Sequence, residues 1–124
     1  MADYNQLIAD FIAAWGARDI DRVMGFFTDD AVYINIPMDP PNEGKVAIRA
    51  FIEGFIPNCS SIEFTVHHQV AAGDIVMNER TDKLVIGGHT IELPVMGVFE
   101  IRDGKISAWR DYFDMKPFQA IGLG

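Results

Sequence analysis

The first half of the chain carries the apolar spacing of amphipathic helices. One stripe recurs at i, i+1, i+4, i+5 and i+8, which is one face of a helix, and consists of Leu7, Ile8, Phe11, Ile12 and Trp15. Gly16 marks the end of this helix, and a shorter one follows from Asp19, with Ile20, Val23, Met24 and Phe27 on its apolar side. The period returns after Gly44, at Ile48, Phe51, Ile52 and Phe55, until Pro57 stops it.

The remaining segments alternate or are rich in β-branched and aromatic residues, which predicts strands. These are Ala31–Ile36, Ser61–Ala72, Ile75–Ile86, His89–Ile101 and Lys105–Phe113. Turns are predicted at Thr28-Asp29-Asp30, Gly73-Asp74, Gly87-Gly88 and Asp103-Gly104, with an irregular loop at Pro37–Pro41. Within Ser61–Ala72, alternation predicts that one face of the strand carries Ile62, Phe64, Val66, His68 and Val70. Met115–Gly124 is expected to be a mobile tail, apolar at Phe118, Ile121 and Leu123.

The order of these elements indicates an α+β fold in a single domain spanning residues 1–124. Two helices, a strand and a helix precede four hairpin-linked antiparallel strands, so helices are segregated against one sheet. We expect a curved, mixed, mostly antiparallel sheet that forms a cone or open barrel. About three helices of the N-terminal half pack with it around an internal pocket.

Composition excludes several classes of function. The net charge is −8 and the ten Lys and Arg residues are scattered, so no nucleic-acid partner is expected. No stretch approaches the roughly 20 apolar residues of a membrane helix, so no membrane partner is expected. Cys59 is the only cysteine, which fits a reducing, cytoplasmic compartment. His67 and His68 diverge on a strand and no metal-ligand spacing or phosphate loop is present, so neither a metal nor a cofactor is expected.

Charged residues in the strand Ile75–Ile86 raise the question of catalysis. Arg80 and Asp82 are two apart, so they share one face of the strand. Two interpretations stay open: a surface ion pair, which the rarity of buried charge favours, or a buried acid–base pair.

Further polar residues fall on faces that are expected to point inward. Asp111 lies between Trp109 and Phe113 on its strand face, where an aspartate is either structural and hydrogen-bonded or catalytic. Ile106, Ala108, Arg110 and Tyr112 form the opposite, outward set of that strand. Tyr33 and Asn35 share a face with Ala31, either as part of an ordinary amphipathic strand or, together with Asp111, as three polar groups able to hold one water molecule.

Five segments, in this order along the chain, resemble the limonene-1,2-epoxide hydrolase family within the broader nuclear-transport-factor-2-like cone fold. They are Tyr33-Ile34-Asn35, Arg80-Thr81-Asp82, Leu93–Phe99, Gly104-Lys105-Ile106 and Trp109–Asp114. The resemblance implies that Asp111 activates water, that Tyr33 and Asn35 position it, that Asp82 protonates the epoxide oxygen and that Arg80 bridges the two carboxylates.

The activity implied by the resemblance is cofactor-independent hydrolysis of an epoxide to a vicinal diol in one step. A fairly apolar epoxide is expected, because the residues predicted to line the pocket are Trp109, Phe113, Leu84, Met77, Met96 and Val98. A homodimer is expected, because an open curved sheet needs its outer face covered. Two alternatives remain: an isomerase or cyclase acting on a steroid-like or polyketide substrate, and a non-catalytic small-molecule-binding domain.

Overall fold

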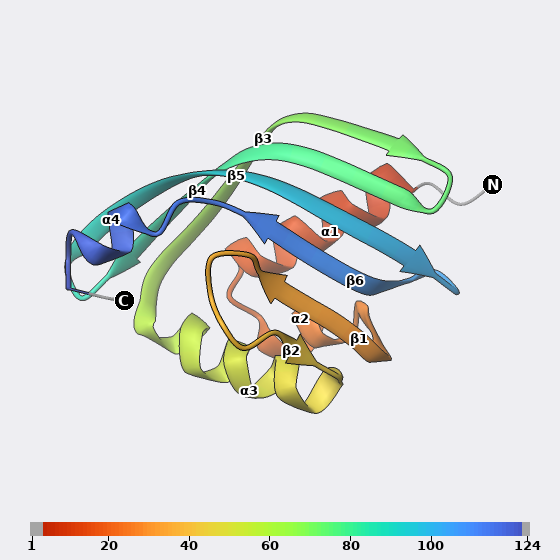
Figure 1. The fold of residues 1–124 in the computed structure, drawn as a ribbon, viewed down its shortest axis with the longest axis horizontal. Coiled ribbons are helices and arrows are strands. Elements are labelled where there is room, and N and C mark those ends of the chain that lie inside the picture. The colour runs from red at the N-terminus through yellow and green to blue at the C-terminus, as the bar shows by residue number, and fades with distance from the viewer. Residues whose placement is uncertain (1–3, 123–124) are drawn as a thin grey trace.

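The computed structural model describes residues 4–122, so Leu123 of the predicted tail lies outside the described residues. Helices and strands follow one another along the chain as shown in Figure 1. The helices are α1 (Tyr4–Gly16), α2 (Ile20–Met24), α3 (Lys45–Phe55) and α4 (Lys116–Gln119), with a short 3₁₀ turn at Ile56–Asn58. The strands are β1 (Phe27–Asn35), β2 (Asn42–Glu43), β3 (Cys59–Ala72), β4 (Ile75–Ile86), β5 (His89–Arg102) and β6 (Lys105–Tyr112). None of the helices within residues 4–122 has the length and apolar character needed to span a membrane.

One six-stranded sheet organises the molecule, in the order β2-β1-β6-β5-β4-β3. The strands from β3 to β6 are antiparallel neighbours joined by hairpins, whereas β1 pairs with β6 in parallel. The long strands curve around α1, and α3 lies beside β1 and β2 (Figure 1). The predicted α+β class and the curved, mostly antiparallel, unclosed sheet are therefore confirmed.

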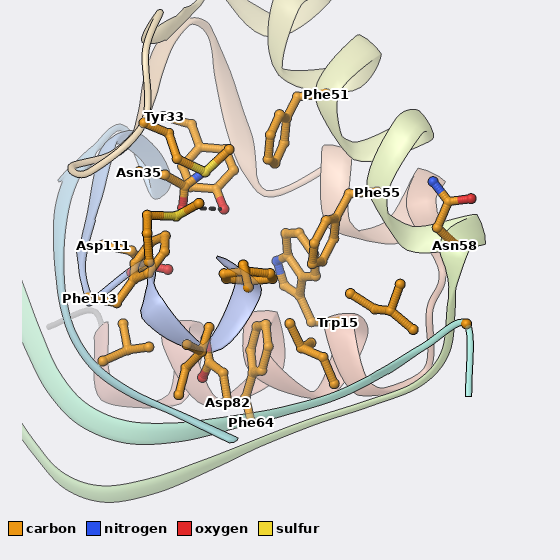
Figure 2. A pocket seen from close by; sticks show the side chains of 18 residues that line it. Trp15, Tyr33, Asn35, Phe51, Phe55, Asn58, Phe64, Asp82, Asp111 and Phe113 are labelled. Atoms are coloured by element: carbon orange, nitrogen blue, oxygen red, sulfur yellow. Dashed lines mark hydrogen bonds between the residues drawn. The ribbon is translucent and has the colours of Figure 1, made fainter. Parts of the chain in front are cut away.

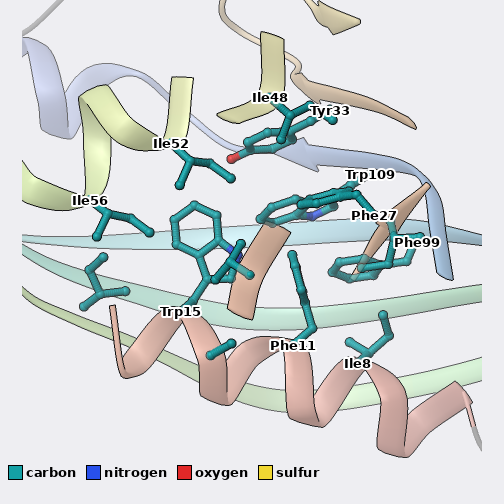
Figure 3. Close-up of a cluster of buried hydrophobic side chains, with 14 of the residues drawn as sticks. Ile8, Phe11, Trp15, Phe27, Tyr33, Ile48, Ile52, Ile56, Phe99 and Trp109 are labelled. Carbon is teal, nitrogen blue, oxygen red and sulfur yellow. The ribbon is translucent and has the colours of Figure 1, made fainter. Parts of the chain in front are cut away.

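The core forms where the apolar stripe of α1 meets the inner face of the sheet (Figure 3). Phe11 is fully buried and makes edge-to-face contacts with several rings, among them Phe27, Phe99 and Trp109. Edge-to-face aromatic pairs contribute about 0.5–1.5 kcal/mol each beyond the area that they bury. The first helix therefore anchors β1, β5 and β6 at the same point, next to the residues with candidate chemistry.

One local prediction about β1 is wrong, and a short strand beside β1 was not predicted. Thr28-Asp29-Asp30, predicted as a turn, lies within β1, because Phe27 pairs with Ile106 and the chain stays extended through an irregular stretch up to Val32. Polar side chains in that stretch bond each other instead of forming a turn, with the Thr28 hydroxyl donating to Asp30 at 2.9 Å. The two-residue strand β2, paired with β1, was not predicted.

The predicted common face of Ile62, Phe64, Val66, His68 and Val70 on β3 holds only as far as Val66. A bulge between Val66 and His68 shifts the alternation by one residue. It leaves His68 and Val70 exposed and brings Gln69 opposite Asn78 of β4.

An irregularity also changes the start of β6. Ile106, predicted to face outward, is fully buried, because the β5–β6 register shifts between Glu100 and Ile101. From Trp109 onward the predicted alternation is confirmed: Trp109 and Asp111 are buried, and Tyr112 is exposed.

The expected mobile tail is partly helical. Residues Lys116–Gln119 form α4, and the Phe118 ring packs against Phe113, 6.2 Å between centroids. The prediction was wrong here because the apolar residues of the tail find partners on the mouth of the pocket described next.

Candidate active site

A cavity of about 530 Å³ opens inside the cone, between the inner face of the sheet and the helices. This volume lies in the range of small-molecule sites, roughly 300–1,000 Å³. Most of its wall is apolar, with an aromatic part made by Trp15, Phe51, Phe55 and Phe64. The polar lining residues include Tyr33, Asn35, Asp82 and Asp111, from β1, β4 and β6 (Figure 2).

The inward face of β4 carries Asn78, Arg80 and Asp82 at alternate positions, and all three are buried. Arg80 is only 1% exposed, so the interpretation as a surface ion pair is wrong. Its Nε donates to Asp82 Oδ1 at 2.7 Å, and its Nη2 donates to Asp82 Oδ2 at 3.2 Å. The same Nη2 also donates to Asp111 Oδ2, so one guanidinium joins both carboxylates.

Gly97 makes this junction between β4 and β6 possible. It sits on β5, in register with Asn78 on one side and Asp111 on the other. A Cβ atom at this position would lie 2.5 Å from Arg80 Nη1 and 2.9 Å from Asp111 Oδ1. The missing side chain therefore leaves the space in which Arg80 reaches across β5 to Asp111.

Aromatic rings cover the guanidinium. The Arg80 Cζ atom lies 5.2 Å from the ring centre of Phe64 and 5.8 Å from that of Trp109. Contacts of this kind favour the cationic form. Burial alone would lower the pKa of Arg80, but Asp111 and Asp82 outweigh that effect and raise it, so the group stays charged.

Two buried carboxylates share this single cation, so the cluster keeps either one net negative charge or one extra proton. Burial raises the pKa of Asp82 to about 6, against the lowering effect of Arg80. Burial also raises the pKa of Asp111, although Arg80 and the Trp109 indole N–H favour its ionised form. Groups this close titrate as a pair, so one proton is held to a higher pH than an isolated carboxyl would hold it.

The parallel pairing of β1 with β6 sets Tyr33 beside Trp109 and Asn35 beside Asp111. The Tyr33 ring stacks on Trp109 with 4.1 Å between centroids, and its hydroxyl donates to Asn35 Oδ1 at 3.2 Å. Burial raises the pKa of Tyr33, so the phenol keeps its proton. Figure 2 shows Tyr33, Asn35 and Asp111 together on one side of the cavity, with Asp82 on the neighbouring wall.

The residues predicted to line the pocket fall into three groups. Leu84 and Phe113 line it. Trp109 lies fully buried beneath Tyr33 and bonds Asp111, so it supports the site from below. The prediction is wrong for Met77, Met96 and Val98, because each lies one residue out of phase with the inward positions of β4 or β5 and faces outward.

Several residues of the site were missed by the sequence analysis. The helical wall residues Trp15, Phe51 and Phe55 were assigned only to apolar stripes, which do not distinguish core from pocket. Gly97 carried a usable signal, since a glycine inside a strand often marks a close approach of other groups. Within residues 4–122, no group of His, Cys, Asp and Glu side chains is arranged to hold a metal ion.

Comparison with known proteins places these observations in context. The sequence model of the protein family described as limonene-1,2-epoxide hydrolase catalytic domain matches residues 2–120. Epoxide hydrolase EphG of Mycobacterium tuberculosis is 36% identical over 107 residues, which cover 85% of this chain and 69% of that protein. The structure of an LEH-like epoxide hydrolase from the same organism superposes with a TM-score of 0.82 at 32% identity, covering 93% of this chain and 85% of that one. An NTF2-like protein of unknown function from Burkholderia pseudomallei, 17% identical, shares the fold with a TM-score of 0.83 over 99% and 98% of the two chains.

Proposed function

The chain belongs to the limonene-1,2-epoxide hydrolase family and is an epoxide hydrolase, and on that basis we propose that it adds water to a fairly apolar epoxide in one step. The product is a vicinal diol. The observation that carries this proposal is the pair of buried carboxylates, joined by one guanidinium, at the polar part of an otherwise apolar cavity.

Opening an epoxide ring by water requires two proton transfers. The attacking water loses a proton as its oxygen bonds to carbon, and the departing ring oxygen gains one. Asp111 takes the first proton as general base, and Asp82 supplies the second as general acid. General acid–base catalysis of this type contributes roughly 10²–10⁴-fold per group.

The family resemblance implies this assignment of base and acid, and the hydrogen bonds of Asp111 support it. Asp111 accepts from Trp109 as well as from Arg80, and both donors stabilise its ionised form. Asp82 accepts from Arg80 at both oxygens, and burial raises its pKa to about 6, so it holds a proton in mildly acidic solution.

Tyr33 and Asn35 hold the attacking water next to Asp111. The Tyr33 hydroxyl proton is committed to Asn35 Oδ1, which leaves the phenol oxygen free to accept a hydrogen bond from water. The Asn35 amide N–H group donates to no other residue among those described, so it can donate to the water oxygen. A water bound in this way presents a lone pair to the substrate carbon while its proton points to the base.

Arg80 keeps the cluster in charge balance through the reaction. Before turnover the negative charge is on Asp111 and the proton on Asp82; afterwards the charge is on Asp82 and the proton on Asp111. Arg80 is bonded to both carboxylates, so the charge moves between two sites that already neighbour the cation. The proton returns to Asp82 through water in the pocket before the next cycle.

The apolar walls select the substrate class. Trp15, Phe55, Leu84 and Phe113 present hydrocarbon surface to whatever lies beyond the reacting carbons. When an epoxide with a cyclic or terpene-like hydrocarbon body binds, it covers that surface and excludes water from it. This stabilises binding by about 25 cal/mol per Å² of apolar surface buried.

Hydrolysis in ¹⁸O-water over a panel of cyclic and terpenoid epoxides tests this proposal. With enzyme in excess, one turnover is expected to place the label directly in the diol. Unlabelled diol in the first turnover, with label entering an aspartate, indicates a covalent route and excludes the one-step mechanism. Exchange at the α-carbon of a ketone without water incorporation would instead support the isomerase alternative.

Two matched variants test the assigned roles. Asp111→Asn and Asp82→Asn keep shape and remove one titratable group each, so each is expected to abolish hydrolysis with the fold intact by circular dichroism. Hydrolysis by Asp111→Asn at the wild-type rate would remove the assignment of the base.

The proposal includes a homodimer. The outer face of the sheet exposes Met77, Met96 and Tyr112. Strand pairing brings them together, since Met96 is in register with Tyr112 and lies two residues from the register partner of Met77, on the same face of β5. A second copy covering this face would remove them from water. Light scattering is expected to give twice the monomer mass, and Met96→Glu to give the monomer; a wild-type monomer would end this part of the proposal.

A further inference from the structure

A chain of hydrogen bonds leads from Arg80 away from the pocket. Arg80 Nη1 donates to Asn78 Oδ1 at 3.0 Å, and Asn78 Nδ2 donates to Gln69 Oε1 at 3.3 Å. Gln69 Nε2 then donates to Asn5 in the first turn of α1, to its Oδ1 at 3.0 Å and its backbone oxygen at 3.2 Å. Asn78 and Gln69 do not line the cavity and therefore lie outside the reacting groups.

Among the described residues, Asn78 is the neutral partner of the guanidinium. The other hydrogen bonds of Arg80 go to Asp82 and Asp111, whose charges exchange during the proposed reaction. The pull of each carboxylate on Arg80 thus changes within every turnover. The bond to Asn78 does not change, because an amide oxygen keeps the same partial charge.

The direction of the whole chain is set by the arginine. A guanidinium has only donors, so the Asn78 oxygen must face it and the Asn78 N–H must point the other way. Gln69 receives that N–H with its oxygen, which turns its own N–H group toward the two oxygens of Asn5. The bulge in β3 is what allows this, since it brings Gln69 into register with Asn78.

We propose that Asn78, oriented by Gln69, is a positioning residue that holds Arg80 in place while the negative charge moves between Asp111 and Asp82. This inference rests on the proposed function for its effect on rate. Its structural part, that Asn78 fixes the guanidinium against both carboxylates, can be measured without turnover.

The first test replaces Asn78 by leucine, which has a similar size and no acceptor. A hydrogen bond to a charged group contributes enough that kcat is expected to fall roughly 10- to 100-fold. KM is expected to stay within about twofold, because Asn78 does not line the cavity. Carboxyl-carbon NMR is expected to show the aspartate pair titrating at higher pH, since a less firmly held Arg80 lowers their pKa values less.

The second test compares Gln69→Leu with Gln69→Glu. Gln69 is half-buried on β3, an edge strand of the sheet, so both variants are expected to fold. Glutamate keeps an acceptor for Asn78 but replaces the N–H donor to Asn5 by a second oxygen, whereas leucine removes both. Measured at each variant's optimal pH, Gln69→Leu is expected to lose roughly 2- to 10-fold in kcat, and Gln69→Glu to lose less.

The outcomes separate the two proposals. A folded Asn78→Leu protein with wild-type kcat and an unmoved carboxyl titration overturns the positioning role. If Asn78→Leu does not fold, equal kcat values for Gln69→Leu and wild type overturn it. If wild-type protein hydrolyses no epoxide of the panel while Asn78→Leu still shifts the titration, the proposed function fails and the positioning role stands.

Discussion

The Trp109 indole nitrogen donates a hydrogen bond of 2.7 Å to Oδ1 of Asp111, two residues further along the same face of β6. The strand period alone brings the two side chains together, and the stacked Tyr33 ring holds the indole from above. The proposed base therefore has a neutral donor that belongs to its own strand, in addition to the cation from β4.

Trp109→Phe tests this donor. Burial raises the pKa of Asp111, and the Trp109 hydrogen bond is one of the interactions that oppose the rise. Without it the pKa rises further, so less base is ionised at low pH. The acid limb of the profile of kcat/KM against pH is expected to move to higher pH, with the alkaline limb, set by loss of the Asp82 proton, less affected. An unmoved acid limb in a folded variant would show that the bond does not tune the base.

Stability should depend on pH with a sign opposite to that of ordinary surface carboxylates. The folded-state pKa of Asp82 is raised to about 6 by burial, and that of Asp111 is also raised. A carboxyl with a raised folded pKa contributes stability that is present below its unfolded pKa and is lost as pH rises through the folded value. Between about pH 4 and about pH 6, urea denaturation is therefore expected to show wild type losing stability relative to the double variant Asp82→Asn/Asp111→Asn. Equal pH dependence of the two proteins would contradict this.

Gly97→Ala should damage the site, and Gly54→Ala provides the matched control. An added methyl group at Gly97 would lie 2.5 Å from Arg80 Nη1 and 3.0 Å from Asn78 Oδ1, so the guanidinium must move. We expect kcat to fall by at least about tenfold, since a shift of about 1 Å in catalytic groups costs up to 10²-fold. Gly54, in α3, has no atom within 4 Å of the added position, and alanine there is expected to stabilise the protein by about 0.5–1 kcal/mol without affecting kcat. Equal kinetics of both variants would refute the role of Gly97.

Phe118 should set the affinity for large substrates. It packs on Phe113 and contributes to the apolar wall of the cavity, and it makes no hydrogen bond or ring contact with the residues of the carboxylate cluster among those described. Phe118→Ala is expected to raise KM for bulky terpenoid epoxides roughly fivefold, about 1 kcal/mol of lost apolar contact, with kcat nearly unchanged. Val46→Ala, at a position 87% exposed on α3, serves as the control and should change neither constant. A drop in kcat alone would place Phe118 closer to the chemistry than the structure does.

The sequence predicted most of the helices and strands, and it predicted which of the key polar residues share a strand face. Strand period alone put Arg80 with Asp82 and Trp109 with Asp111, and these alternations hold in the structure. Whether the face of β4 was buried could not be read from its own residues, because that depends on α1 and β5 packing against it. The predicted lining is wrong for Met77, Met96 and Val98 because an apolar side chain on a strand can face the outer side of the sheet as well as the pocket, and strand alternation places these three outside.

The bulge in β3 and the pairing of distant strands could not be predicted from the residues of each strand alone. The inserted residue after Val66 has no signature in a β-branched and histidine-rich strand, yet it brings Gln69 to Asn78. The parallel alignment of Asn35 with Asp111 joins segments far apart in the chain, and no local pattern specifies it.

The pairing of β1 with β6 also determines at which stage of folding the active site becomes complete. The hairpins from β4 to β6 bring Arg80, Asp82 and Asp111 together from neighbouring strands. Tyr33 and Asn35 reach them only when β1 docks beside the last strand, a long-range step of the kind that forms slowly. On a chain still emerging from the ribosome, the residues of β1 and β4 are present before Asp111 of β6, so the complete set of catalytic groups can form only after the last strand has emerged.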